Sequence, residues 1–166
     1  MFFKIIYNFI LLPILYFIIL LGGLFSRKVR KGFAGRLKSK KILKSFINKS
    51  KNDSKEIFWF HAASLGEYEQ IKPVLSGLKE IEPNSYFILS LFSPSGYDFI
   101  DDEQVDCKVY LPFDSYWGVK SCLKIVKPKK IILAGYDVWP NLIWSAKKLN
   151  IHTVLFAARF SKRSTK

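Results

Sequence analysis

The first 52 residues contain no Asp or Glu, although twelve of the chain's 27 Lys and Arg residues lie there. The remainder has fifteen basic and thirteen acidic side chains, so the formal charge of +14 belongs almost entirely to an N-terminal arm. A nucleic-acid-binding domain carries basic charge on its folded part, and no stacking aromatics alternate with the lysines of this arm. The charge distribution therefore argues against nucleic acid as a partner.

Cysteine is scarce as well. Cys107 and Cys122 are fifteen residues apart, and no CxxC spacing or histidine cluster accompanies them. A disulfide framework or a zinc site would need more ligands or closer pairing, so reduced structural thiols are expected. The sequence has neither G-x-G-x-x-G nor G-x-x-x-x-G-K-[ST], so it has no dinucleotide fingerprint and no P-loop. The acidic run Asp101–Glu103 is expected to be a solvated turn, because a hard-metal site needs oxygens from several loops.

Residues 5–26 have no charged side chain at all. As a helix, the apolar run from Ile5 to Phe25 would be roughly 30 Å long, the thickness of a bilayer core. Its length and the lack of a small-residue cleavage site argue against a removed signal peptide. Residues 1–26 are therefore predicted to be a membrane anchor, and Asn8 and Pro13 leave open whether it crosses the bilayer or lies on one face.

Basic residues follow this run at once, beginning with Arg27, Lys28, Arg30, Lys31 and Arg36. Positive charge beside an apolar segment is typical of the cytoplasmic side, and it attracts anionic lipids. Residues 27–54 are therefore predicted to be a juxtamembrane segment that binds the inner leaflet. A solvated basic linker is the alternative.

Short apolar runs alternate with amphipathic ones in the rest of the chain, residues 55–166. The pattern predicts strands at 57–60, 86–92, 108–111, 130–134 and 153–156, and helices at about 68–81, 116–126 and from Pro140. Ser93–Gly96 is expected to form a turn. Strands that are apolar on both faces, separated by helices, indicate a parallel Rossmann-like α/β sheet. Ligands of such folds bind at the carboxyl ends of the strands.

The loops at those ends carry a distinctive series of motifs. They read His61-Ala-Ala-Ser-Leu-Gly-Glu67, Ser93-Pro-Ser-Gly96, Pro112-Phe-Asp114, Gly135-Tyr-Asp-Val-Trp-Pro-Asn141 and Ala158-Arg-Phe-Ser-Lys-Arg-Ser164. In this order they resemble the family of Kdo (3-deoxy-D-manno-octulosonic acid) transferases of lipid A biosynthesis. Lys31-Gly-Phe-Ala-Gly-Arg-Leu37 is similar to the basic segment that follows the membrane anchor in that family.

The resemblance implies the N-terminal, acceptor-side half of a GT-B glycosyltransferase in the bacterial inner membrane, facing the cytoplasm. It also implies inverting transfer from CMP-Kdo to a lipid A precursor, in lipopolysaccharide core biosynthesis, with no metal and no cofactor. The C-terminal donor domain of the family does not follow in this sequence, so the chain alone is expected to be inactive. A non-catalytic, membrane-tethered half-enzyme or interaction module is the alternative.

The resemblance also identifies candidate site residues. Glu67 matches the catalytic glutamate and would act as general base, although a residue at this place can equally satisfy donors at a helix start. His61 is expected to be packed at a strand end, because no second histidine or thiol lies near it in sequence. The expected substrate-binding residues are Ser64, Gly66, Ser93, Ser95, Gly96, Asp137, Trp139, Pro140, Asn141, Arg159 and Arg163.

Three positions depart from the family pattern. Asp137 stands where the family usually has the second glutamate of an ETExWPN segment, and it can serve the acceptor or simply start a helix. Ala157 replaces a common Asn, and Gly35 replaces a Glu. Arg159 and Arg163 suit an anionic ligand, but they can equally be exposed charges on a loose tail.

Overall fold

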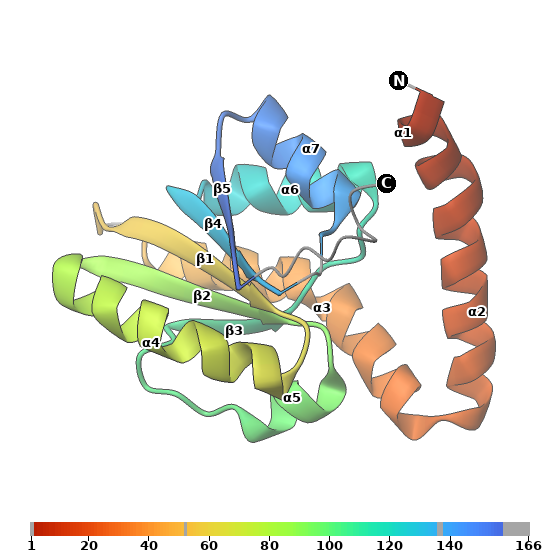
Figure 1. The fold of residues 1–166 in the computed structure, drawn as a ribbon, viewed down its shortest axis with the longest axis horizontal. Helices are drawn as coiled ribbons and strands as arrows, with labels where there is room; N and C mark the ends of the chain where they lie inside the picture. Colours follow the sequence, from red (N-terminus) through yellow and green to blue (C-terminus); the bar gives the residue numbers. More distant parts are fainter. Residues whose placement is uncertain (1, 52, 136–137, 158–166) are drawn as a thin grey trace.

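A computed structural model of the chain describes residues 2–51, 53–135 and 138–157. Its centre is one sheet of five parallel strands (Figure 1). The strands are β1 (Glu56–Ala62), β2 (Ser85–Leu91), β3 (Cys107–Tyr110), β4 (Lys130–Ala134) and β5 (His152–Phe156), in the spatial order β3-β2-β1-β4-β5. The predicted α/β class with a parallel sheet is confirmed.

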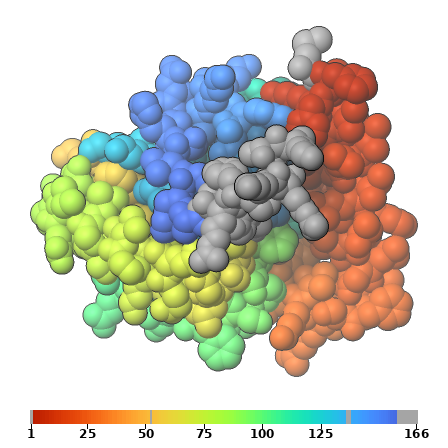
Figure 2. All heavy atoms as spheres, in the orientation of Figure 1, coloured from red at the N-terminus to blue at the C-terminus, as the bar shows by residue number. Residues whose placement is uncertain are grey.

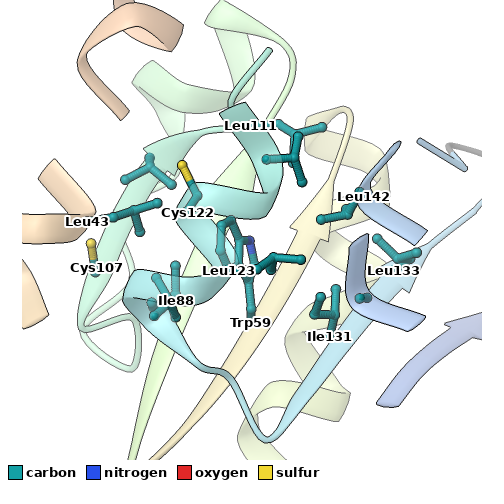
Figure 3. Packing of buried hydrophobic residues seen from close by; sticks show 14 residues of the cluster. Leu43, Trp59, Ile88, Cys107, Leu111, Cys122, Leu123, Ile131, Leu133 and Leu142 are labelled. Atoms are coloured by element: carbon teal, nitrogen blue, oxygen red, sulfur yellow. The ribbon is translucent and has the colours of Figure 1, made fainter. Parts of the chain in front are cut away.

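Helices cover both faces of the sheet. Those on one face are α4 (Leu65–Ile81) and α5 (Pro94–Phe99), and those on the other are α3 (Arg27–Lys49), α6 (Tyr116–Val126) and α7 (Pro140–Lys148). Side chains that alternate along β1 enter the hydrophobic cores on the two faces of the sheet, because Phe58 and Phe60 pack under α4 whereas Trp59 packs under α6. Figure 3 shows the second core, in which Trp59, Leu123 and Ile131 lie close together.

The predicted strands are all present, and α6 has the predicted bounds. Helix α4 begins three residues earlier than predicted, at Leu65, because the Ser64 side chain caps it. The prediction of a turn at residues 93–96 is wrong, since Pro94 starts helix α5 and Ser93 is its N-cap. Proline at the first helical position has the φ angle that a helix requires, so the same residues serve a turn or a helix start.

The N-terminal helix runs from Phe2 to Phe25 through α1 (Phe2–Ile6), a π-helical turn η1 (Tyr7–Leu11) and α2 (Leu12–Phe25). It has 24 residues, and an 18-residue stretch of it has a mean hydropathy of 2.4, so by length and composition the helix can cross a membrane. The π turn precedes Pro13, whose ring would clash with the carbonyl four residues back in a regular helix. The turn widens the helix where Pro13 requires it.

The basic segment forms helix α3, which follows α2 after a bend at Ser26, where the backbone is extended (φ −124°, ψ 116°). Leu43 of α3 is fully buried in the sheet core, so this helix also covers the sheet. Gly35 allows the close approach, because a Cβ built there would lie 2.2 Å from the ring of Tyr110. The departure at Gly35 therefore has a packing reason in this chain.

Candidate functional site

The strand order places β1 and β4 side by side, while the chain leads from β1 toward β3 on one side and from β4 to β5 on the other. This is the topological switch point, outside which α/β sheets bind their ligands. Glu67, in the first turn of α4, lies there. Its Oε2 accepts a hydrogen bond of 2.6 Å from the Ala63 N–H. A Cβ built on Gly135, just after β4, would lie 2.9 Å from its Oε1.

The start of α4 holds this carboxylate in place. The Ser64 Oγ caps the helix by accepting the Glu67 N–H at 3.3 Å, while the Glu67 side chain reaches back to the residue before the cap. The arrangement is close to a capping box, so the helix-start role has a contact in its support. The same contact fixes the carboxylate at the switch point. Both roles can therefore coexist.

Two further predicted segments meet this loop. The Ser93 N–H donates to the Ala63 carbonyl at 2.9 Å, which extends the pairing of β1 and β2 beyond the sheet. Gly96 is buried, and a Cβ there would lie 3.4 Å from the backbone nitrogen of Leu65. Helix α5, which also includes Ser95, thus packs directly on the start of α4. Gly66 is exposed, and a Cβ there would meet nothing within 4 Å.

His61, near the carboxyl end of β1, bonds to both Trp139 and β2. It is fully buried, which confirms the expected packed strand end, and burial lowers the pKa of its imidazole to about 4. Trp139 Nε1 donates to His61 Nε2 at 3.1 Å, so the proton of the neutral ring is on Nδ1, which donates to the Ser90 carbonyl. The Trp139 indole also stacks on Phe92 at a centroid distance of 5.1 Å. His61 therefore sets the orientation of Trp139.

Asp114 anchors the Pro140–Asn141 segment. Trp139, the N-cap residue of α7, makes no side-chain cap, and Asp114 replaces it by accepting the N–H groups of Asn141 (3.1 Å) and Leu142 (3.0 Å). The Asn141 side chain donates to the Asp114 carbonyl and is fully buried. Asn141 thus works inside the fold as the partner of Asp114, and Asp114 is a positioning residue that was absent from the predicted site.

The N-terminal helix joins the same network. The Tyr7 hydroxyl donates to Asp114 Oδ2 at 2.8 Å, and the amides of Asn8 and Asn141 exchange hydrogen bonds of 3.2 and 2.9 Å. Asn8 interrupts the apolar run, and that interruption was the only sequence signal of this contact. A helix expected only to anchor the chain therefore also contacts the segment that positions Trp139.

Asp114 predicts a measurable pH dependence. Burial raises the pKa of this carboxyl from 3.8 to about 6, so between these values the folded state binds more protons than the unfolded state. Its contribution to stability is complete below pH 3.8 and is lost as the pH rises through 6. Relative to Asp114→Asn, the free energy of unfolding of the native chain should fall by on the order of 2–3 kcal/mol between pH 4 and 7 in urea titrations. Parallel curves for the two proteins would contradict this.

The predicted lipid-binding residues differ in their surroundings. Arg27 and Lys28 are exposed. Arg30 Nη1 donates to the carbonyls of Gly23 (2.9 Å) and Leu24 (3.3 Å) at the end of α2. Lys31 pairs with Asp98 at 2.6 Å on the surface. Arg36 is half-buried and points back to the sheet edge. The structure therefore gives three of these five side chains protein partners of their own.

Asp137, Arg159 and Arg163 lie outside the described residues, so their roles stay predictions. In the acidic run, Asp102 accepts hydrogen bonds from the Tyr68 hydroxyl and from the Gln104 N–H. The two cysteines are unpaired and buried, in agreement with structural thiols. Residues 2–51, 53–135 and 138–157 include no group of three His, Cys, Asp or Glu side chains arranged for a metal ion.

These features define a Rossmann-like domain with a fixed carboxylate at its switch point and an apolar helix along one side. The model of the 3-deoxy-D-manno-octulosonic-acid transferase (kdotransferase) family matches residues 32–166. The chain belongs to this family.

Three relatives illustrate the match, each a 3-deoxy-D-manno-octulosonic acid transferase. The protein of Aquifex aeolicus is 33% identical over 105 residues, 61% of this chain and 29% of its own length. The protein of Haemophilus influenzae is 32% identical over 108 residues, 64% and 25% of the two chains. The protein of Rickettsia bellii is 27% identical over 163 residues, 95% and 36%. The chain thus spans about a quarter to a third of the length of these relatives.

Proposed function

We propose that the chain is the acceptor-side half of a GT-B glycosyltransferase, which moves Kdo from CMP-Kdo to a lipid A precursor in lipopolysaccharide biosynthesis. The observation on which this rests is the Glu67 carboxylate, held by Ala63 and lying beside Gly135 at the switch point. Ligands bind outside this edge in sheets of this kind, and a carboxylate there lies where an acceptor hydroxyl can be reached.

In the proposed reaction, a glucosamine hydroxyl oxygen of the acceptor attacks the anomeric carbon of Kdo from the face opposite to the CMP group. The new C–O bond forms as the bond to the CMP phosphate breaks, and the configuration inverts. Glu67 takes the proton of the attacking hydroxyl. This assignment requires no cofactor and no metal, and the donor would be held mainly by a second domain. Residues 2–157 would supply acceptor position and proton transfer.

The N-terminal helix suggests how the acceptor is reached. Figure 2 shows it running along the side of the globular part, and its Tyr7, Asn8 and Tyr16 face the domain. Its opposite face is apolar and exposed, with Phe9, Phe17 and Leu24 among its residues. Because Tyr7, Asn8 and Tyr16 contact the domain, a helix that crossed the bilayer would draw the adjoining part of the domain into it. We propose that it lies in the interface plane, on the cytoplasmic face of the inner membrane.

A reconstitution assay tests this function. The chain would be co-expressed with the C-terminal domain of the Rickettsia bellii relative, and transfer from CMP-Kdo to a tetraacylated lipid A precursor would be measured. Product is expected only when both parts are present, because one domain alone holds only one of the two substrates. If a well-folded, membrane-bound pair gave no product, the non-catalytic module would be the better description.

A further inference from the structure

A cavity lies beside the candidate site, lined by residues of α2, of α3 and of the segment from β2 to α5. Figure 1 shows how these elements are arranged. The volume of the cavity is about 160 Å³, well above the roughly 30 Å³ that a water molecule occupies in the liquid. Ile19 and Val29 form its apolar wall, Phe92 and Pro94 its base, and two cations, Lys28 and Arg36, line the rest with Gly32. No acidic residue is part of this lining.

Arg36 is the unusual member. Its Nη2 donates to the Phe92 carbonyl at 2.8 Å, and its guanidinium lies 4.1 Å from the centre of the Phe92 ring. Within the described part of the chain, no carboxylate forms an ion pair with it. Arginine stays charged in proteins, and a half-buried charge without a counter-ion is unfavourable. An anionic ligand with several oxygens would satisfy the remaining N–H donors of this side chain.

Gly32 makes room for the guanidinium. Residues 28, 32 and 36 share one face of α3, since they are four apart. A Cβ on Gly32 would lie 2.8 Å from Arg36 Nη1 and 3.2 Å from Pro94. Lys28 stands two helical turns before Arg36, about 12 Å along the axis, and its side chain is exposed. On this face of α3, Arg36 is therefore the half-buried cation, Lys28 is the exposed cation, and Gly32 leaves space between them.

The surroundings indicate an amphiphilic ligand. Ile19 belongs to α2, part of the apolar helix Phe2–Phe25, which is long enough to cross a membrane. An interfacial helix lies at the depth of lipid headgroups, which places the cavity at the level of their phosphates. We propose that Lys28 and Arg36 form a binding pocket for the phosphate group of a lipid. The choice of a lipid rests on the proposed function, because an enzyme with a lipid acceptor works at this depth.

A purely structural role for Arg36 explains less. Its bond to the Phe92 carbonyl and its contact with the Phe92 ring support the neighbourhood of Trp139. They do not explain why a second cation lines the same cavity. The two roles differ in one measurable respect, since only a phosphate pocket makes Lys28 and Arg36 act on the same ligand.

The test is the binding of defined phosphates to the full chain in a neutral detergent, measured by titration calorimetry. The probes are dihexanoyl phosphatidic acid, glucosamine-1-phosphate and, as a zwitterionic control, dihexanoyl phosphatidylcholine. Arg36→Gln should raise the Kd of a phosphate probe by at least about tenfold, because a charge-assisted, multidentate contact is lost. Lys28→Gln should raise it about threefold. Lys38→Gln removes a charge from an exposed position of the same helix and should change the Kd less than twofold.

Dependence on Arg36 for both phosphate probes would support a pocket that accepts either source of phosphate. If only the binding of the sugar phosphate depends on Arg36, the ligand is the acceptor. If only the binding of phosphatidic acid depends on it, the ligand is a membrane phospholipid. An equal loss of affinity for the phosphate probes in Arg36→Gln and Lys38→Gln, or no loss of affinity in either variant, would overturn the proposal. If Arg36→Gln unfolds, Lys28→Gln is compared with Lys38→Gln instead. A larger loss of affinity in Lys28→Gln supports the pocket, and equal losses overturn it. Because binding is measured without transfer, a failed pocket leaves the transferase proposal standing, and a failed transfer assay leaves the pocket standing.

Discussion

Glu67→Gln is expected to lower kcat/KM for Kdo transfer by about 10²- to 10⁴-fold in the reconstituted enzyme, the range typical of a lost general base. Glutamine has the shape of glutamate, and its amide oxygen can still accept the Ala63 N–H. It cannot take up the proton of the acceptor hydroxyl. The measurement is the initial rate of transfer from CMP-Kdo, with circular dichroism to verify the fold.

Glu69→Gln is the matched control. Glu69 is exposed on the same helix two residues further on, so its substitution removes the same charge without touching the switch point. Its rate should stay within about twofold of the native rate. A Glu67→Gln enzyme that keeps a tenth or more of the native kcat/KM would show that Glu67 only supports the helix start. If Glu67→Gln lost stability in parallel with its transfer rate, Glu67 would likewise be assigned only to supporting the helix start.

Glutamate at Phe9, Phe17 and Leu24 together is expected to lower the partition of the chain onto anionic vesicles by about a thousandfold or more. These side chains are 61–76% exposed on the outward face of the N-terminal helix. Burying each large apolar side chain contributes about 1.5–3 kcal/mol, and the loss of three corresponds to at least that factor. Co-sedimentation with vesicles that contain anionic lipid measures the effect. Contacts of Tyr7 and Asn8 with the domain should persist.

The control carries three glutamates at exposed apolar positions outside this helix. Val74 and Ile81 on α4, and Phe99 on α5, are 42–78% exposed. Their substitution changes the net charge equally, so any difference between the two triple variants comes from the helix face. Partition should fall much less in the control, by the electrostatic contribution alone. Similar losses in both variants would mean that charge, and not the apolar face, holds the chain on the membrane.

The sequence was sufficient to predict the fold class and the site of the carboxylate. Short runs apolar on both faces predict a parallel sheet, because helices must cover such strands on both sides. Glu67 lies at the start of the helix that follows such a strand, so its place at the ligand-binding edge depends on local order alone. The uncharged run at residues 5–26 likewise predicts a membrane-length helix from its composition.

Local signals were ambiguous where one set of residues fits two structures. Ser93-Pro-Ser-Gly96 has the composition of a turn and also of a helix start, and the packing of Gly96 on the backbone of Leu65 goes with the helix. Ala157 has a φ of 56°, a region that Asn adopts much more readily than Ala. The Asn that the family commonly has at that position is thus suited to the backbone found here.

The remaining features depended on contacts between residues far apart in the chain. Asp114 caps a helix that starts 26 residues later, and Asn8 meets Asn141 across 133 residues. Arg36 belongs by sequence to a basic segment suited to a lipid surface, but the approach of α3 to β3 at Gly35 turns it toward Phe92. Periodicity and composition report which faces are apolar. Only the packing of those faces decides which polar side chains meet between them, and at this edge they position Trp139 and leave Arg36 without a counter-ion among the described residues.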